Sequence, residues 1–218
     1  MLLDLKIADK IVIVIGGGSE AYRKIHSFIE SGATIWVISK DFSKDVIHLN
    51  DEKKVALLKT EIKDGKSFID SLKPKPDVLL AATDDCKLNL ELVKAAKKCG
   101  SLVYAVDNPS VSDFILPAVA RVGDVKVAVL TGGKSPAIAH ILRERIEKLV
   151  TPQDLLEIEL QAKIRAVLKE HIAESDERSK MLYEIHSNPS IKQALRQGNL
   201  EEAENLAMKL IATKENKE

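Results

Sequence analysis

The segment that most constrains the fold is an unbroken apolar run, Ile11–Ile15, followed at once by three glycines. Every residue of the run is Ile or Val, so a strand built from it is apolar on both faces. Such a strand belongs in the middle of a parallel sheet, where helices cover both faces. We therefore expect the chain to begin with a helix-covered parallel sheet.

Further β-branched runs follow the first at intervals that leave room for helices. They are residues 34–39, 55–59, 78–82 and 102–106. The clearest amphipathic helices between them are predicted over residues 20–29 and 88–98. Alternating strands and helices imply right-handed crossovers, so the predicted class is α/β, with an N-terminal Rossmann-type parallel sheet.

The pattern changes after Asp107. Residues 114–122 and 125–130 are strand-like runs separated by Gly123-Asp124, which suits a tight turn between antiparallel strands. Ser135-Pro136 and Thr151-Pro152 each supply an N-cap followed by a proline at the first helical position. We expect a sheet domain over 1–112, a segment with antiparallel strands over 113–150 and an all-helical domain over 151–218.

Composition excludes several classes of function. The 218 residues carry 33 basic and 33 acidic side chains and only 4% aromatics, so a nucleic-acid binder is not expected. The apolar runs are far shorter than the roughly 18 residues of a membrane span, and residues 1–6 lack a signal-peptide pattern. We expect a cytoplasmic protein without membrane contact. Cysteine and histidine spacing indicates no metal site.

The first glycine loop carries a dinucleotide-binding pattern. Gly16, Gly18 and Ala21 match G-x-G-x-x-G/A directly after a strand and at the start of a helix. The first glycine permits the tight turn, the second admits a pyrophosphate, and the helix N-terminus attracts its charge. We expect Gly16, Gly18, Ser19 and Glu20 to contact the cofactor. A plain glycine turn is the alternative.

The end of the second strand does not decide between NAD and NADP. An acidic residue that binds the ribose 2′-hydroxyl is expected there. The strand ends instead in Ser39-Lys40, with Asp41 slightly late. Ser39 and Lys40 suit a 2′-phosphate equally well.

Polar residues follow the fourth and fifth strands, at the edge where open α/β sheets bind ligands. Thr83 and Asp84 come after the fourth strand, and Asp107 and Asn108 after the fifth. Helix capping and an Asx turn are the alternative roles. Beside a nicotinamide, the carboxylate of Asp107 can instead remove a proton as hydride leaves.

A second glycine loop, residues 131–136, opens a helix and presents N–H groups to an anionic group, with capping again the alternative. The surrounding segment has more basic than acidic side chains, which weakly favours a polycarboxylate ligand, although solvated helix charges are the commoner explanation for residues 143–148. His140 is the one histidine near the second glycine loop, where a ligand cleft is expected. The basic residues are Arg121, Lys126, Lys134, Arg143, Arg145 and Lys148.

Several motifs, taken in order, resemble the precorrin-2 dehydrogenase family, which includes stand-alone dehydrogenases and the N-terminal part of siroheme synthase. The resemblance covers nearly the whole chain. The motifs are Ile15-Gly16-Gly17-Gly18 through Ala21 and Arg23-Lys24, Ala81-Ala82-Thr83-Asp84-Asp85, Val106-Asp107, Phe114-Ile115-Leu116-Pro117-Ala118, and Thr131-Gly132-Gly133-Lys134-Ser135-Pro136 with Leu142-Arg143-Glu144.

This resemblance implies NAD-dependent oxidation of precorrin-2, a carboxylate-rich tetrapyrrole, to sirohydrochlorin in a homodimer. It implies that residues 1–112 bind NAD and that residues 113–150 dimerise. Asp107 stands at the family's essential aspartate, thought to be a general base. Cofactor contacts are expected at Gly16, Gly18, Ser19, Glu20, Ser39, Lys40, Thr83 and Asp84, and substrate contacts at Asn108, Phe114, Thr131, Gly132, Lys134, Ser135 and His140.

The chain departs from the family pattern in places. Glu20 replaces an apolar residue, Ser39-Lys40 replace the more usual Ala-Pro, and Asp113 stands where a small or acidic residue is usual. Two alternatives stay open. One is a bifunctional dehydrogenase and ferrochelatase that also inserts iron into sirohydrochlorin, and the other is a non-catalytic NAD-sensing module.

Overall fold

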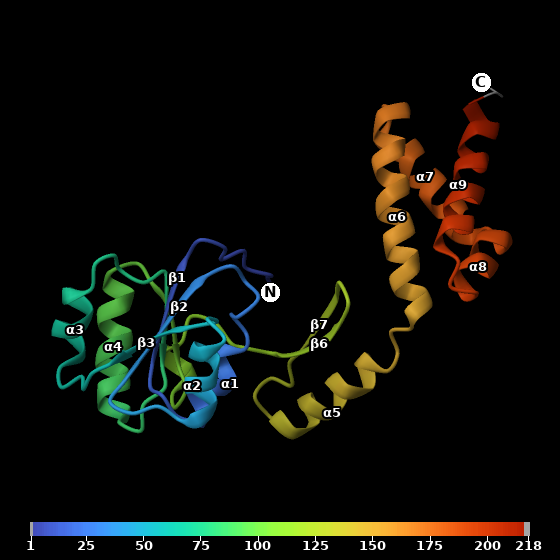
Figure 1. The fold of residues 1–218 in the computed structure, drawn as a ribbon. Coiled ribbons are helices and arrows are strands. Elements are labelled where there is room, and N and C mark those ends of the chain that lie inside the picture. The colour runs from blue at the N-terminus through green and yellow to red at the C-terminus, as the bar shows by residue number, and fades with distance from the viewer. Residues whose placement is uncertain (1, 216–218) are drawn as a thin grey trace. The chain divides into compact units, whose positions relative to one another are not determined.

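The computed structural model describes residues 2–215. They divide into two compact units, with the boundary between Leu116 and Pro117 (Figure 1). Each unit is described here by itself. The predicted division at residues 112 and 150 stays a prediction.

The first unit is a five-stranded parallel sheet in the order β3-β2-β1-β4-β5, with β1 (Ile11–Ile15) at its centre. The other strands are β2 (Thr34–Ser39), β3 (Ala56–Lys59), β4 (Val78–Ala81) and β5 (Leu102–Ala105). Four residues of β1 are buried, because it pairs with β2 on one side and with β4 on the other. The predicted Rossmann-type sheet is confirmed.

Helices cover both faces of this sheet. One face packs Val12 and Val14 against α1 (Ser19–Ile25) and α2 (Lys44–Asp51). The opposite face packs Ile13 and Ile15 against α3 (Gly65–Ser71) and α4 (Cys86–Lys98) (Figure 1). Alternate residues of the apolar run therefore serve two separate cores, as a central parallel strand requires.

The first helix is shorter than predicted, because it ends at Ile25 and not at residue 29. Beyond it the chain forms turns in which the Ser31 hydroxyl donates to the Phe28 carbonyl at 2.5 Å. Local side-chain bonds of this kind compete with helical hydrogen bonding. Phe28 nevertheless stays in the core, 6% exposed.

The strand predicted over 114–122 begins only at Ala118. Phe114 and Leu116 instead pack against the core of the first unit. Pro117 has no N–H to donate to a ladder, which explains why pairing starts after it. Asp113, directly before Phe114, bonds back to β5, since the Val103 N–H donates to its Oδ2 at 3.0 Å.

The second unit begins with the predicted antiparallel hairpin, β6 (Ala118–Val122) and β7 (Val125–Val129), joined at Gly123-Asp124. Helix α5 (Pro136–Glu147) contacts both strands. The all-helical region follows as predicted, with α6 (Pro152–His171), α7 (Ser175–Ser187), α8 (Pro189–Arg196) and α9 (Leu200–Glu215). These last helices bury a core of their own around Ile164 and Ile185. Within residues 2–215, no helix is long and apolar enough to cross a membrane.

Candidate dinucleotide and carboxylate site

The glycine loop lies between β1 and α1, at the carboxyl edge of the sheet. Gly16 is buried and has a φ of 120°, a conformation that side chains disfavour. A Cβ on Gly16 would lie 2.2 Å from the Ala82 carbonyl oxygen, so only glycine fits against the end of β4. Its N–H donates to the Ile38 carbonyl at 2.9 Å, which ties the loop to β2 as well.

Gly17 has a role that the spacing argument missed. A Cβ at this position would lie 2.2 Å from the Asp41 carbonyl oxygen and 2.9 Å from the Phe42 ring. The Gly17 carbonyl also accepts a hydrogen bond from the Ser43 N–H at 2.8 Å. The chain that leaves β2 is thus packed directly on Gly17. The signal in the sequence is the unbroken run of three glycines, where the motif needs only two.

Gly18 is exposed, and nothing lies within 4 Å of a Cβ built on it. It is the N-cap of α1 and offers no side chain to the first-turn N–H groups, which helix geometry leaves without intrahelical acceptors. An open helix N-terminus of this kind fits a pyrophosphate. The exposed Ser19 begins the helix beside it.

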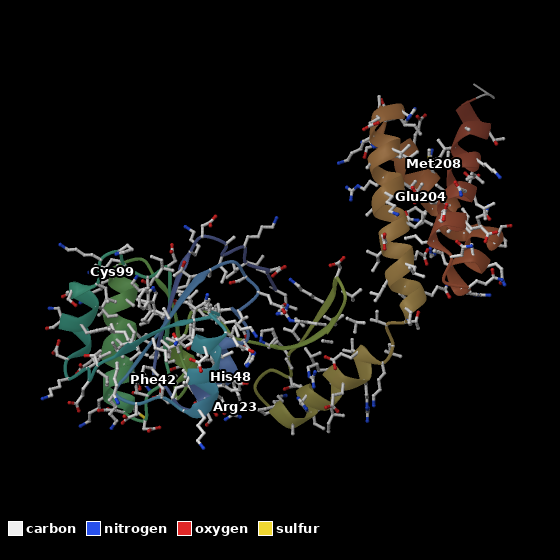
Figure 2. All side chains as sticks on the ribbon, in the orientation of Figure 1. Arg23, Phe42, His48, Cys99, Glu204 and Met208 are labelled. Atoms are coloured by element: carbon white, nitrogen blue, oxygen red, sulfur yellow. The ribbon has the colours of Figure 1, made fainter. Side chains whose placement is uncertain are left out.

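Glu20 stands in the first turn of α1 and forms an ion pair with Arg23, which is labelled in Figure 2. A carboxylate there stabilises the helix dipole, but it also competes with an incoming anion for the same positive end. The predicted contact between Glu20 and the cofactor stays a prediction.

Ser39 and Lys40 lie where β2 ends, next to the segment that packs on Gly17. Ser39 is half-buried and its carbonyl accepts from the Thr60 N–H at 2.9 Å, whereas Lys40 is exposed. Asp41 forms an ion pair with Lys59, with 3.4 Å between Oδ1 and Nζ. Both residue types that distinguish NAD from NADP therefore stand at this edge.

The polar residues after β4 have mainly structural bonds. The Asp85 carboxylate caps α4, accepting from the N–H groups of Lys87 at 2.9 Å and Leu88 at 3.1 Å. Capping, the alternative role, thus belongs to Asp85. Thr83 donates its hydroxyl to Asn89 Oδ1 at 2.7 Å, while Asp84 is exposed. The cofactor contacts predicted for Thr83 and Asp84 stay predictions.

Asn89 is a site residue that the sequence analysis missed. It is 1% exposed, on the face of α4 that packs against the sheet. Its amide nitrogen donates to the Thr83 carbonyl at 3.0 Å and to Asp107 Oδ1 at 3.0 Å. The available signal was an asparagine that falls on the buried face of a helix, close to Leu92 and Val93.

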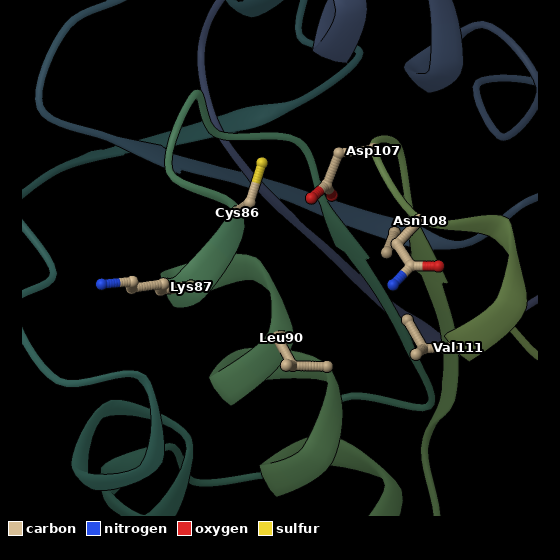
Figure 3. A pocket seen from close by; sticks show the side chains of 7 residues that line it. Cys86, Lys87, Leu90, Asp107, Asn108 and Val111 are labelled. Carbon is tan, nitrogen blue, oxygen red and sulfur yellow. The ribbon is translucent and has the colours of Figure 1, made fainter.

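Asp107 follows β5 and borders a pocket of about 280 Å³ (Figure 3). The pocket is lined by Cys86, Lys87, Leu90, Ala105, Asp107, Asn108 and Val111. The Asp107 carboxylate raises the pKa of the Cys86 thiol, chiefly through a hydrogen bond between the two side chains. The thiol therefore stays protonated at neutral pH and is able to donate to the carboxylate.

Asn108 and Phe114 are held within the first unit. The Asn108 side chain caps the short helix η1 (Pro109–Val111) by accepting from the Ser110 N–H at 3.1 Å. The Phe114 ring packs on Tyr104, with 5.6 Å between centroids, and Lys24 Nζ lies 5.6 Å from the centroid of Tyr104. Their predicted substrate contacts stay predictions.

The second glycine loop lies in the second unit, between β7 and α5. The Ser135 side chain caps α5 by accepting from the Ile138 N–H at 3.3 Å, and the Thr131 hydroxyl donates to the Ser135 carbonyl at 3.0 Å. His140 Nε2 lies 3.1 Å from Oε1 of Glu144, which stands one turn further along α5. Gly132 and Lys134 are exposed. The loop is thus braced by its own side chains, and its predicted role in substrate binding stays a prediction.

Known proteins resemble this chain over most of its length. A siroheme synthase from Methylococcus capsulatus is 32% identical over 206 residues, which are 94% of this chain and 42% of that protein. A precorrin-2 dehydrogenase from Methanosarcina barkeri is 29% identical over 190 residues, 87% of this chain and 84% of that protein. The chain therefore spans less than half of that siroheme synthase. These relatives confirm the resemblance that the motifs indicated.

A solved structure of SirC, a precorrin-2 dehydrogenase, has the same fold, with a TM-score of 0.73 at 20% identity over 96% of this chain and 99% of that one. A family profile described as "Putative NAD(P)-binding" matches residues 3–118. That match includes β1 to β5, the three glycines and Asp107, and it extends over more than half of the chain. The chain belongs to this NAD(P)-binding family.

Proposed function

We propose that this protein is an NAD-dependent precorrin-2 dehydrogenase that forms sirohydrochlorin. The observation that carries the proposal is the placement of Asp107, whose carboxylate borders a pocket at the same edge of the sheet as the dinucleotide loop. The Methanosarcina barkeri relative supports the choice of substrate, because the similarity extends over 84% of its length.

The reaction removes two electrons and two protons from the reduced macrocycle, one hydrogen leaving as hydride and the other as a proton. When bound, NAD supplies the hydride acceptor. The chain supplies a base, because the Asp107 carboxylate is exposed at the pocket while the Asn89 amide holds one of its oxygens. Most of the acceleration comes from holding macrocycle and nicotinamide in contact.

The cofactor site is proposed at Gly16, Gly18 and Ser19, with Glu20, Thr83 and Asp84 beside it. NAD is proposed over NADP, although Ser39 and Lys40 suit a 2′-phosphate. The open space over Gly18 and the uncapped first turn of α1 support the pyrophosphate position.

Substrate contacts are proposed at Asn108 and Phe114 of the first unit. Separately, they are proposed at the second glycine loop and helix of the second unit, at Thr131, Gly132, Lys134, Ser135 and His140. Basic side chains on this segment suit the carboxylates of a tetrapyrrole. We also propose a cytoplasmic homodimer, in which residues 113–150 form the dimerisation segment.

The test is anaerobic incubation of the purified protein with precorrin-2 and NAD, following NADH absorbance and the macrocycle spectrum. Wild-type protein is expected to turn over. Asp107→Ala is expected to bind NAD normally and to lose about 100- to 10,000-fold in kcat, the usual contribution of a general base. Wild-type activity in Asp107→Ala would exclude this role.

Two parallel reactions separate the alternatives. Added Fe²⁺ with sirohydrochlorin but no nucleotide produces siroheme only if the protein is also a ferrochelatase. A protein that binds NAD but oxidises no precorrin-2 with either nucleotide is better described as a nucleotide-sensing module.

A further inference from the structure

We infer that Asn89 is a positioning residue that fixes the Asp107 carboxylate for proton transfer. The inference deepens the proposed function and rests on it, because it assumes that Asp107 accepts a proton from the substrate. The hydrogen bonds that support it stand independently of the substrate.

The Asn89 side chain has no unused hydrogen-bonding capacity. A primary amide offers two donors on nitrogen and two acceptor positions on oxygen. The nitrogen donates to the Thr83 carbonyl and to Asp107 Oδ1, both at 3.0 Å. The oxygen accepts from the Thr83 N–H at 3.2 Å and from the Thr83 hydroxyl at 2.7 Å. The amide is thus locked by Thr83 and cannot rotate away without losing several bonds.

Burial makes this lock rigid. Asn89 is 1% exposed, whereas Asp107 is exposed at the pocket. A buried amide that lost a partner would leave a polar group unsatisfied, at a cost of roughly 1–3 kcal/mol. The surroundings therefore hold Asn89 in one orientation, and Asn89 transmits that orientation to a carboxylate that solvent would otherwise leave free to rotate.

The first turn of α4 presents a second group to the same carboxylate. Cys86 lies three residues before Asn89, so both side chains project from one face of the helix. Figure 3 shows the Cys86 sulfur and the Asp107 carboxylate on neighbouring elements of the pocket. The thiol therefore reports where Asp107 is held, because its pKa is raised mainly by contact with Asp107.

The first experiment measures kinetics. Asn89→Asp keeps the oxygen that accepts from the Thr83 N–H and hydroxyl. It removes both amide donors, the one to Asp107 Oδ1 and the one to the Thr83 carbonyl, and it places a second carboxylate beside Asp107. We expect kcat to fall about 10- to 100-fold, the range that misplacement of a reacting group produces. The KM values and the dissociation constant of NAD are expected to stay within about threefold of wild type, since Asn89 itself makes none of the close contacts of Gly16, Gly17 or Gly18.

The matched control is Ser101→Ala. Ser101 is 5% exposed, and its hydroxyl donates to the Pro76 carbonyl at 2.6 Å at the opposite end of the sheet. This variant loses a buried hydrogen bond in the same unit without touching Asp107. An equal loss of kcat in Ser101→Ala, or an unchanged kcat in Asn89→Asp, would overturn the inference.

The second experiment does not need turnover. In a Cys99→Ser background Cys86 is the only thiol of the chain. Its pKa is measured from the pH dependence of its alkylation by iodoacetamide. Asp107→Asn is expected to lower that pKa, and Asn89→Ala is expected to lower it by at least half as much. If the pKa of the Cys86 thiol is unchanged in Asn89→Ala, Asn89 does not hold the carboxylate of Asp107.

The two experiments separate two kinds of failure. If wild-type protein does not oxidise precorrin-2 but the Asn89→Ala thiol shifts as expected, the proposed function fails and the positioning of Asp107 is retained. If wild-type protein turns over and either Asn89 variant behaves as wild type, the positioning role alone is wrong.

Discussion

Adjacent glycines give a sharp test of the site, because Gly17 and Gly18 are expected to respond oppositely to alanine. In Gly17→Ala the new Cβ would lie 2.2 Å from the Asp41 carbonyl oxygen, against an ordinary contact of 3.4–4 Å. The backbone after β2 must therefore shift by more than 1 Å. In Gly18→Ala the new Cβ meets no atom within 4 Å.

The cost of Gly17→Ala has three contributions. Overpacking costs about 1–3 kcal/mol. Strain in the hydrogen bond from Ser43 to the Gly17 carbonyl costs about 0.5–1.5 kcal/mol more. Replacing glycine by alanine also lowers the conformational entropy of the unfolded chain, which stabilises the folded protein by about 0.4–1 kcal/mol. We expect the free energy of unfolding to fall by about 2 kcal/mol, within a range of about 0.5–4 kcal/mol.

Gly18→Ala is expected to leave the free energy of unfolding within about 0.5 kcal/mol of wild type. Its φ of −86° suits alanine, and the small loss at the N-cap is offset by the restricted unfolded chain. The methyl group instead occupies the space proposed for the pyrophosphate. We expect NAD affinity to fall at least tenfold, which corresponds to about 1.4 kcal/mol.

Urea unfolding is followed by the fluorescence of Trp36, the single tryptophan, which lies in β2. NAD binding is measured by calorimetry on the folded variants. Equal stability of the two variants would refute the steric argument for Gly17. Wild-type NAD affinity in Gly18→Ala would refute the pyrophosphate position.

Three further predictions concern charge and packing. Glu20→Gln is expected to tighten NAD binding severalfold at low salt, because it removes a negative charge from the positive end of α1, and calorimetry at two salt concentrations should show the gain shrink as salt rises. The pKa of Asp77 is lowered mainly by the Ile11 N–H, so the stability this carboxylate provides is present above its ordinary pKa of 3.8 and lost as pH falls through the lowered value. Asp77→Asn should therefore unfold at lower temperature than wild type at pH 7, and the difference should shrink below pH 3.8. Ile164→Ala, at a fully buried position, is expected to cost about 2–5 kcal/mol, measured by circular dichroism during urea unfolding.

The sequence was sufficient for the elements whose pattern is local. The Ile11–Ile15 run predicted a central strand, and the turn at Gly123-Asp124 predicted the hairpin, because periodicity and turn chemistry act over a few residues. The first glycine motif was recognised for the same reason. The strand before the motif and the helix after it could both be predicted from the neighbouring residues.

Contacts between segments that are distant in the sequence could not be predicted. Gly17 is required because Asp41 packs on it, and Asn89 matters because Asp107 lies across from it, 18 residues later. No spacing rule encodes either contact, since each depends on how the sheet brings separate loops together. The strand predicted before Ala118 was wrong for a related reason. Phe114 is held by a core that forms only when the unit folds.

The loop after β4 connects the two halves of the proposed site. The Ala82 carbonyl closes against Gly16, and the next residue, Thr83, binds Asn89, which binds Asp107. The glycine loop and the carboxylate are therefore joined through one short segment whose contacts are all close-packed or hydrogen-bonded. A change at Gly16 has to be absorbed by Ala82 and Thr83 before the sheet can accommodate it. For this reason a substitution at Gly16 should weaken NAD binding and also disturb Asp107, whereas one at Gly18 should affect binding alone.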